Sequence, residues 1–175
     1  SAYANKVRQS IITNSLLLNA ELIKKINEYG IKLQISIDAA DQETYEAIRI
    51  GAKYEVLIEK LELLKKYSLS NKSNGCSIET VVITKNFNKL EDIVNFAILY
   101  KFESVSFLNY ISYNKEDALR LSNHQYAEVV NAIKLLRKKY KKISINTNID
   151  LDFRLTSNNP GCFAENGQNN PNRKK

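Results

Sequence analysis

Residue types that build metal sites and disulfide frameworks are scarce in this sequence. It contains two cysteines and one histidine, and it has no methionine and no tryptophan. Two distant thiols form neither a disulfide framework nor a Cys/His zinc site, and a lone histidine does not make a histidine-based metal site. No apolar run approaches the roughly 20 residues of a membrane-spanning helix, and no secretory signal accompanies the N-terminal charges. We therefore expect a cytoplasmic protein without a membrane segment.

The composition is otherwise that of a globular protein, with 43% hydrophobic and 26% charged residues. The length of 175 residues suits one domain, since domains usually have roughly 100–200 residues. From Ser157 onward the sequence is rich in asparagine, glycine and proline, and it ends in charged residues. We therefore predict one domain over residues 1–150 and a mobile tail over residues 151–175.

The net charge of +7 is concentrated in two short segments. Six basic residues and no acidic residue lie between positions 134 and 142, and three more basic residues end the chain. Without these nine charges the net charge would be −2, whereas a nucleic-acid footprint spreads over a face. We favour the solvated C-terminal end of a helix, where the helix dipole stabilises cations. A basic RNA-associated α/β domain is the alternative, so nucleic acid is not the expected partner.

Short β-branched segments alternate with helical patterns along the chain. Strands are expected at residues 10–13, 33–38, 77–83, 104–108 and 143–145. Between them apolar residues recur at helical spacing. Such alternation gives parallel strands with outer helices joined by right-handed crossovers. The sequence thus predicts an α/β fold, either part of a (βα) barrel or a flavodoxin-like sheet with helices on both faces.

Several residues mark the expected ends of helices. The predicted N-terminal caps are Asn19, Asp41, Asn88 with Glu91, and Ser122 with Gln125. Gly30 lies where a helix needs a left-handed residue after its last turn. His124 falls in the first turn of the helix that Ser122 begins, where we expect an exposed residue rather than a catalytic base.

Small polar residues follow the ends of four predicted strands. They are Thr13, Asn14 and Ser15, then Ser36 and Asp38, then Thr84 and Asn86, and finally Asn109. Such residues also cap helices and form turns. In parallel α/β folds, however, ligands bind at the carboxyl ends of the strands. The presence of hydrogen-bonding groups at all four ends therefore favours a ligand site.

Four phrases occur in this order along the chain: IITNS at 11–15, ISIDA at 35–39, TYEAIRIG at 44–51 and VVITKN at 81–86. Together they resemble the radical S-adenosylmethionine (SAM) enzymes. The branch with a SPASM-type C-terminal extension has Thr-Asn-Gly, Ser-Ile-Asp-Gly and Arg-x-Gly phrases in the same order. The resemblance covers roughly residues 11–136. It implies a portion of a partial (βα)6 TIM-like barrel, with four to five parallel strands and outer helices.

The sequence departs from that family in several respects. The CxxxCxxC loop that holds the 4Fe-4S cluster is absent, as is the Gly-Gly-Glu phrase that binds the SAM amino group. Both precede the Thr-Asn-Gly strand in the family, so we interpret the chain as a fragment that begins after them. Ser15 and Ala39 replace two usual glycines. Cys162 could begin a SPASM-type extension, but a stray thiol is favoured because no second cysteine lies nearby.

The resemblance implies that nine residues border SAM and that none is a catalytic residue or metal ligand. Ser36 and Arg49 correspond to positions that hold the SAM carboxylate, a task that suits a guanidinium. Asp38 and Asn86 are candidates for contacts with the ribose hydroxyls. Backbone groups around Phe107, Leu108 and Asn109 are expected to border the adenine, and the Phe107 side chain is expected to give apolar contact. Thr13 and Asn14 would line the same mouth.

The resemblance also implies a function for the protein from which such a fragment comes. That enzyme would use a 4Fe-4S cluster to cleave SAM reductively to a 5′-deoxyadenosyl radical, which abstracts hydrogen from a peptide or small-molecule substrate. The fragment alone would be catalytically silent. The alternatives are a cluster-less degenerate barrel that binds a peptide or partner, and the RNA-associated domain. For Arg49, the alternative is a surface ion pair with Glu43 or Glu46.

One strand is expected to lack a neighbour. Residues 11–13 form the first predicted strand, and a half-barrel leaves this strand unpaired on its upstream side. Unpaired strand edges promote association. We therefore predict that the fragment dimerises through this edge or covers it with its own N-terminal residues.

Overall fold

The computed structural model describes residues 9–68, 75–114 and 117–149. Over these residues the chain forms a five-stranded parallel sheet and five helices. The strands are β1 (Ser10–Thr13), β2 (Lys32–Ser36), β3 (Cys76–Val82), β4 (Ser104–Asn109) and β5 (Ser144–Thr147). The helices are α1 (Ala20–Glu28), α2 (Gln42–Ile48), α3 (Tyr54–Ser68), α4 (Leu90–Leu99) and α5 (Asn123–Lys139). The predicted α/β alternation is confirmed.

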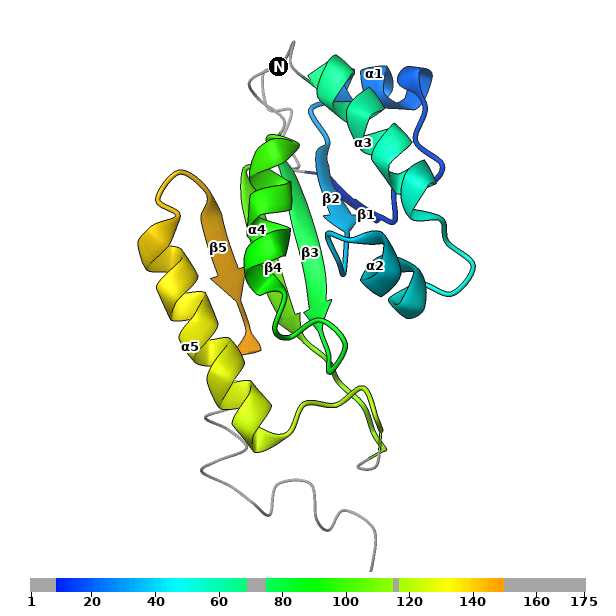
Figure 1. Cartoon of the computed structure of the whole chain (residues 1–175). Helices are drawn as coiled ribbons and strands as arrows, with labels where there is room; N and C mark the ends of the chain where they lie inside the picture. Colours follow the sequence, from blue (N-terminus) through cyan, green and yellow to red (C-terminus); the bar gives the residue numbers. More distant parts are fainter. Residues whose placement is uncertain (1–8, 69–74, 115–116, 150–175) are drawn as a thin grey trace, which may run out of the picture.

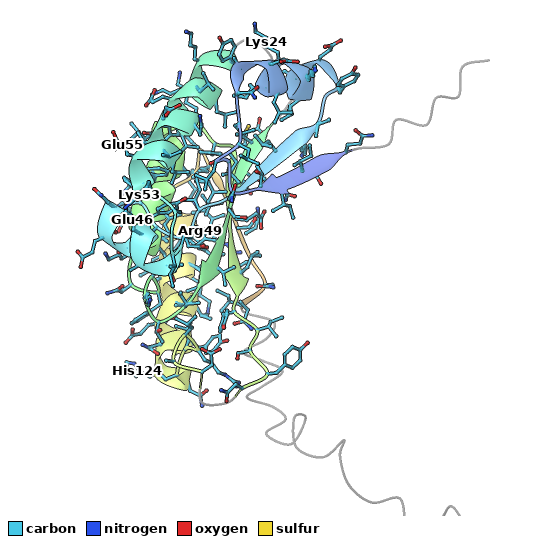
Figure 2. The ribbon with its side chains drawn as sticks, turned by 90° about the vertical axis from the view of Figure 1, so that its right-hand side faces the viewer. Lys24, Glu46, Arg49, Lys53, Glu55 and His124 are labelled. Carbon is cyan, nitrogen blue, oxygen red and sulfur yellow. The ribbon has the colours of Figure 1, made fainter. Side chains whose placement is uncertain are left out.

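Each strand pairs with the next strand along the chain, and this distinguishes the two predicted architectures. A flavodoxin-like sheet has the order 2-1-3-4-5 and helices on both faces. Here the order is β1-β2-β3-β4-β5, and the helices lie together on one side of the sheet (Figures 1 and 2). The sheet is therefore a portion of a (βα) barrel with outer helices, as expected.

The two faces of the sheet differ because side chains alternate along each strand. The face toward the helices is apolar, and its buried residues include Leu33, Ile35, Ile78, Val82, Val105, Phe107 and Ile145. The helices pack their own apolar residues onto it, including Ile23, Ile26, Leu57, Leu61, Ile93, Val94 and Ile133. The opposite face, which we call the open face, carries Ser10, Ile12, Lys32, Gln34, Ser36, Ser77, Glu79, Val81, Ser104, Ser106, Leu108, Ser144 and Asn146.

Three of the predicted helix caps are confirmed. The side chain of Asn19 accepts the Leu22 N–H at 2.9 Å, and Ser122 forms a reciprocal capping box with Gln125. Asp41 accepts the Thr44 N–H at 2.9 Å and begins α2. Partial burial raises the pKa of Asp41, but hydrogen bonds from the Thr44 N–H and from the Lys89 ammonium outweigh burial. The net effect is a pKa below the ordinary value.

The cap predicted at Asn88 is wrong. Helix α4 begins one residue later than expected, so Lys89 occupies the capping position and makes no side-chain cap bond. The preceding turn is closed by the backbone, since the Lys89 N–H donates to the Asn86 carbonyl at 2.9 Å. Glu91 pairs with Lys139 on α5 instead of bonding back to the cap.

Helices α1 and α4 end in the same motif with different residues at the left-handed position. Gly30 has a φ of 66° after α1, as predicted, and Lys101 has a φ of 61° after α4. The closing backbone bonds run from Ile31 to Ile26 at 3.0 Å and from Phe102 to Ala97 at 2.9 Å. Glycine is usual at this position of the motif, because a side chain makes the left-handed conformation costly. Lys101 therefore carries backbone strain that Gly30 does not.

Strand β1 pairs only with β2 in the part of the chain that the structure describes. Ile12 of this edge strand is 67% exposed. Residues 1–8 and 150–175, which include the predicted edge cover, the tail and Cys162, lie outside the described residues. Association through β1 thus stays a prediction. Among the helices described, none has the length and hydropathy needed to cross a membrane.

Candidate functional site

The carboxyl edge of the sheet is organised around Asp38, which follows β2. Asp38 is only 6% exposed, and its Oδ2 lies 2.7 Å from Nη2 of Arg49, the residue after α2. Its Oδ1 accepts the Val81 N–H of β3 at 3.0 Å. Figure 2 shows Arg49 between α2 and the strands. The alternative pairing of Arg49 with Glu43 or Glu46 is wrong, because the end of α2 returns the guanidinium to the sheet.

Asn86 joins the ends of β2 and β3. It is fully buried, and its Nδ2 donates to the carbonyls of Asp38 and Val81, both at 2.9 Å. Its Oδ1 accepts the Ile83 N–H at 2.8 Å. Both amide protons are therefore engaged within the chain, and a proton donated to a ribose would replace one of these bonds. Thr84 forms hydrogen bonds with the loop before α5, through its N–H to Leu119 and its hydroxyl to Ala118.

The residues after β1 form a tight turn. Thr13 accepts the Ser15 N–H at 3.1 Å, and Asn14 accepts the Leu16 N–H at 3.2 Å. Ser15 is fully buried and has a φ of 67°. This left-handed conformation explains why a glycine is usual in the resembling phrase, since glycine adopts it without a steric cost. Thr13 and Asn14 thus act as turn formers in the described structure, and their place at a ligand mouth stays a prediction.

The end of β4 corrects one expectation. Phe107 is fully buried on the helix side of the sheet, so its ring does not line the open face. The alternation of side chains puts Leu108 there instead. Asn109 accepts a hydrogen bond from the Tyr126 hydroxyl of α5, and its N–H donates to the Asn148 side chain at 2.8 Å.

The open face is polar along its middle, a feature that the sequence analysis missed. In register across the sheet lie Ser36, Glu79, Ser106 and Asn146. Parallel strands buried on both faces are apolar almost throughout. The signal was present in the sequence as polar residues at every second position, such as Ser77 with Glu79 and Ser104 with Ser106.

Two buried polar atoms in the described structure have no hydrogen-bond partner. They are the Tyr45 hydroxyl and Nε of Arg49, four residues apart at the end of α2. Burial raises the pKa of Tyr45, and the charge of Arg49 partly opposes this effect. Because buried polar groups are nearly always satisfied, these two donors are unusual in the described structure.

The described residues do not supply ligands for a metal cluster. No group of three or more histidine, cysteine, aspartate and glutamate side chains comes together among them. Cys76 lies at the start of β3. The 4Fe-4S cluster implied by the resemblance therefore does not fit the described part of the chain.

The basic end of α5 is partly engaged within the molecule. Lys139 pairs with Glu91 of α4, and Nε of Arg137 donates to the Ile145 carbonyl at 2.8 Å. These contacts and the location in the last turn agree with a cationic helix terminus. His124, in the first turn, is exposed as expected and lies 2.9 Å from Glu128.

A parallel sheet in sequential order, with helices outside and polar groups at its carboxyl edge, defines part of a (βα) barrel. Residues 2–97 match the Radical SAM superfamily. The chain therefore belongs to the Radical SAM superfamily. An uncharacterized protein of Methanocaldococcus jannaschii is 32% identical over 108 residues, which are 60% of this chain and 36% of that protein. The chain thus spans about a third of this curated relative.

Solved structures show the same fold. SuiB of Streptococcus suis, bound to S-adenosylmethionine, has a TM-score of 0.63 and 16% identity over 82% of this chain and 32% of its own. Native anSMEcpe, with bound AdoMet and a peptide, has a TM-score of 0.67 and 18% identity over 82% of this chain and 41% of its own. Identity at this level supports the fold, a portion of a radical SAM barrel, and the chain covers less than half of either protein.

Proposed function

We propose that this chain supplies the SAM-binding part of the barrel of a radical SAM enzyme. The observation that carries the proposal is the ion pair of Asp38 and Arg49 at the carboxyl edge of the sheet, in a chain of this superfamily. Ligands of (βα) barrels bind at this edge. SuiB and anSMEcpe, whose fold the chain shares, are both bound to SAM in their structures.

Arg49 and Ser36 are the residues proposed to hold the SAM carboxylate. Arg49 uses Nη2 for Asp38, whereas its buried Nε has no acceptor. A carboxylate accepts well from a guanidinium, and the pairing with Asp38 fixes the direction of the Arg49 side chain. Ser36 presents its side chain on the open face two residues before Asp38. The guanidinium and the hydroxyl are donors that suit a carboxylate, and this supports the proposal.

The remaining site residues shape the edge. We propose that Asp38 and Asn86 contact the ribose hydroxyls through the lone pairs that their internal hydrogen bonds leave open. Leu108 and Asn109 would border the adenine, with Phe107 taking part through its backbone only, because its ring is buried. Thr13 and Asn14, after β1, would line the same mouth of the barrel.

The cluster, the substrate and the compartment belong to the whole protein. We propose that the 4Fe-4S ligands lie in parts of the full-length protein other than the described residues. From the same resemblance we propose a peptide or small-molecule substrate and membership of the SPASM-like branch. We also propose a cytoplasmic location, as expected from the sequence. A peptide is bound in the anSMEcpe structure, which supports the peptide alternative.

The test uses the full-length protein that contains this chain. It is reconstituted anaerobically with iron and sulfide and reduced in the presence of SAM, and 5′-deoxyadenosine is quantified by chromatography. We expect the product to form, and we expect Ser36→Ala to raise the Kd for SAM by about three- to tenfold, as expected for one lost hydrogen bond. Ser104→Ala, on the same face but at the opposite end of its strand, is the matched control. No SAM binding and no product would contradict the proposal.

A further inference from the structure

Glu79 is the only carboxylate on the open face of the described sheet. It lies in the middle of β3, with Ser36 of β2 and Ser106 of β4 as its register partners. Its Oε1 accepts a hydrogen bond from Nε2 of Gln34 at 3.1 Å. A neutral amide thus orients this carboxylate without neutralising it.

No cation of the described residues compensates the charge of Glu79. Two carboxylates near the carboxyl edge do have such partners: Asp38 pairs with Arg49 at 2.7 Å, and Asp41 pairs with Lys89 at 3.0 Å. No lysine or arginine in the described ranges lies within 4.0 Å of the Glu79 carboxylate.

Lys32, the one cation on the open face among the residues that the structure describes, is too far along its strand to compensate Glu79. Lys32 is four residues before Ser36, which is level with Glu79 in the sheet register. At about 3.3 Å per residue, this separation is roughly 13 Å along the strand. Water screens interactions between charges that far apart at physiological salt.

We propose that Glu79 is a specificity-determining residue that binds a cationic nitrogen group of the substrate, an alkylammonium or a guanidinium. This inference rests on the proposed function, because it places the substrate on the open face of the barrel. A ligand that covers this face removes water from Glu79, and a desolvated carboxylate is costly unless a cation pairs with it. Ser106 and Asn146, level with Glu79, offer neutral hydrogen-bonding groups beside the cation.

The selectivity follows from the same electrostatics. A cationic ligand gains a charge-assisted hydrogen bond with Glu79, a neutral ligand leaves the carboxylate unpaired, and an anionic ligand adds repulsion. The ammonium of SAM has the same chemistry as a lysine side chain. The experiment therefore measures SAM and a lysine probe separately.

The test is an NMR titration of the labelled 175-residue chain with N-acetyl-lysine N-methylamide and its neutral norleucine counterpart. We expect saturable shifts of the Glu79 side chain and of β3 amides, with a Kd for the lysine probe about tenfold below that for norleucine. Glu79→Gln, which keeps the size of the side chain, should abolish this preference. Glu79→Lys should instead favour the N-acetyl-glutamate counterpart. Circular dichroism and thermal unfolding check that each variant is folded.

The matched control is Glu55→Gln, which removes one negative charge from exposed α3 on the helix side (Figure 2). It should leave the preference for lysine unchanged. If the lysine probe binds no tighter than norleucine, or neither probe gives saturable shifts, the inference is overturned. The inference also fails if Glu79→Gln weakens SAM and leaves the ratio of lysine to norleucine unchanged. If wild-type chain prefers lysine but does not bind SAM, the proposed function fails and the assignment of Glu79 stands.

Discussion

The ion pair between Asp38 and Arg49 should be the most strongly coupled pair of charges in the described structure. Asp38 is 6% exposed. Without Arg49, the backbone N–H of Val81 would be the one described hydrogen-bond donor left to its carboxylate. Removing one partner of a buried ion pair costs about 3–5 kcal/mol. The Arg49 side chain is 25% exposed, so water can partly replace it, and we expect Arg49→Met to lower the free energy of unfolding by about 2–3 kcal/mol.

A double-mutant cycle isolates the interaction. Asp38→Asn keeps an acceptor for the Val81 N–H while removing the charge, and Arg49→Met keeps the length of the aliphatic stem. We expect a coupling free energy of about 1–2 kcal/mol, measured by urea unfolding of the two single variants and the double variant.

The matched control is the exposed pair of Glu21 and Lys25 on α1, at 2.8 Å with side chains 78% and 59% exposed. This pair should couple by less than about 0.5 kcal/mol, because both charges are solvated. Equal coupling free energies for the two pairs would mean that the Asp38–Arg49 ion pair neither organises the carboxyl edge nor fixes the direction of the Arg49 side chain.

Three further predictions concern the helix ends. Lys101→Gly should raise the free energy of unfolding by about 1 kcal/mol, and Gly30→Ala at the equivalent position should lower it by a similar amount, because both residues have a positive φ; a change of the same sign in both variants, measured by chemical denaturation, would contradict this. Ser122→Ala should cost about 1 kcal/mol through the lost capping box, whereas Asn88→Ala, which removes no cap, should change stability by less than about 0.5 kcal/mol. Because the pKa of Asp41 is lowered in the folded state, its ionised carboxylate stabilises the fold at pH values above 3.8, the ordinary pKa, and this contribution is lost as the pH falls through the folded-state pKa. Asp41→Asn should therefore make the free energy of unfolding decline less steeply below about pH 4. An unchanged slope would refute the assignment.

The order of strands and helices could be predicted from the sequence because each element carries its own local signal. Apolar residues recur at helical spacing, and capping residues such as Asn19 and Ser122 act within three positions of their partners. The same local reasoning failed at Asn88, because a backbone turn moved the start of α4 by one residue. The choice between a barrel and a flavodoxin-like sheet depended on strand order, which is a long-range property.

The candidate site could be predicted only in part. Polar residues at the strand ends were visible in the sequence, but their partners were not, since Asp38 bonds to Val81 and Asn86 more than 40 positions away. The burial of Phe107 follows from which face of β4 meets the helices, and a strand sequence alone does not specify that face. The alternation that puts Glu79 on the open face was present in the sequence. Which face of the sheet the helices leave uncovered could not be predicted from it.

The central claim is that SAM binds at the carboxyl edge of this sheet. The most direct measurement is a titration of the isotope-labelled 175-residue chain with SAM, monitored by the backbone amide resonances. We expect saturable shifts of the amide resonances at the ends of β2, β3 and β4, including those of Ser36, Val81 and Asn109. The amide of Arg49, after α2, should also shift, and the rest of the chain should not. Absence of saturable shifts, or shifts confined to the outer faces of α4 and α5, would contradict it.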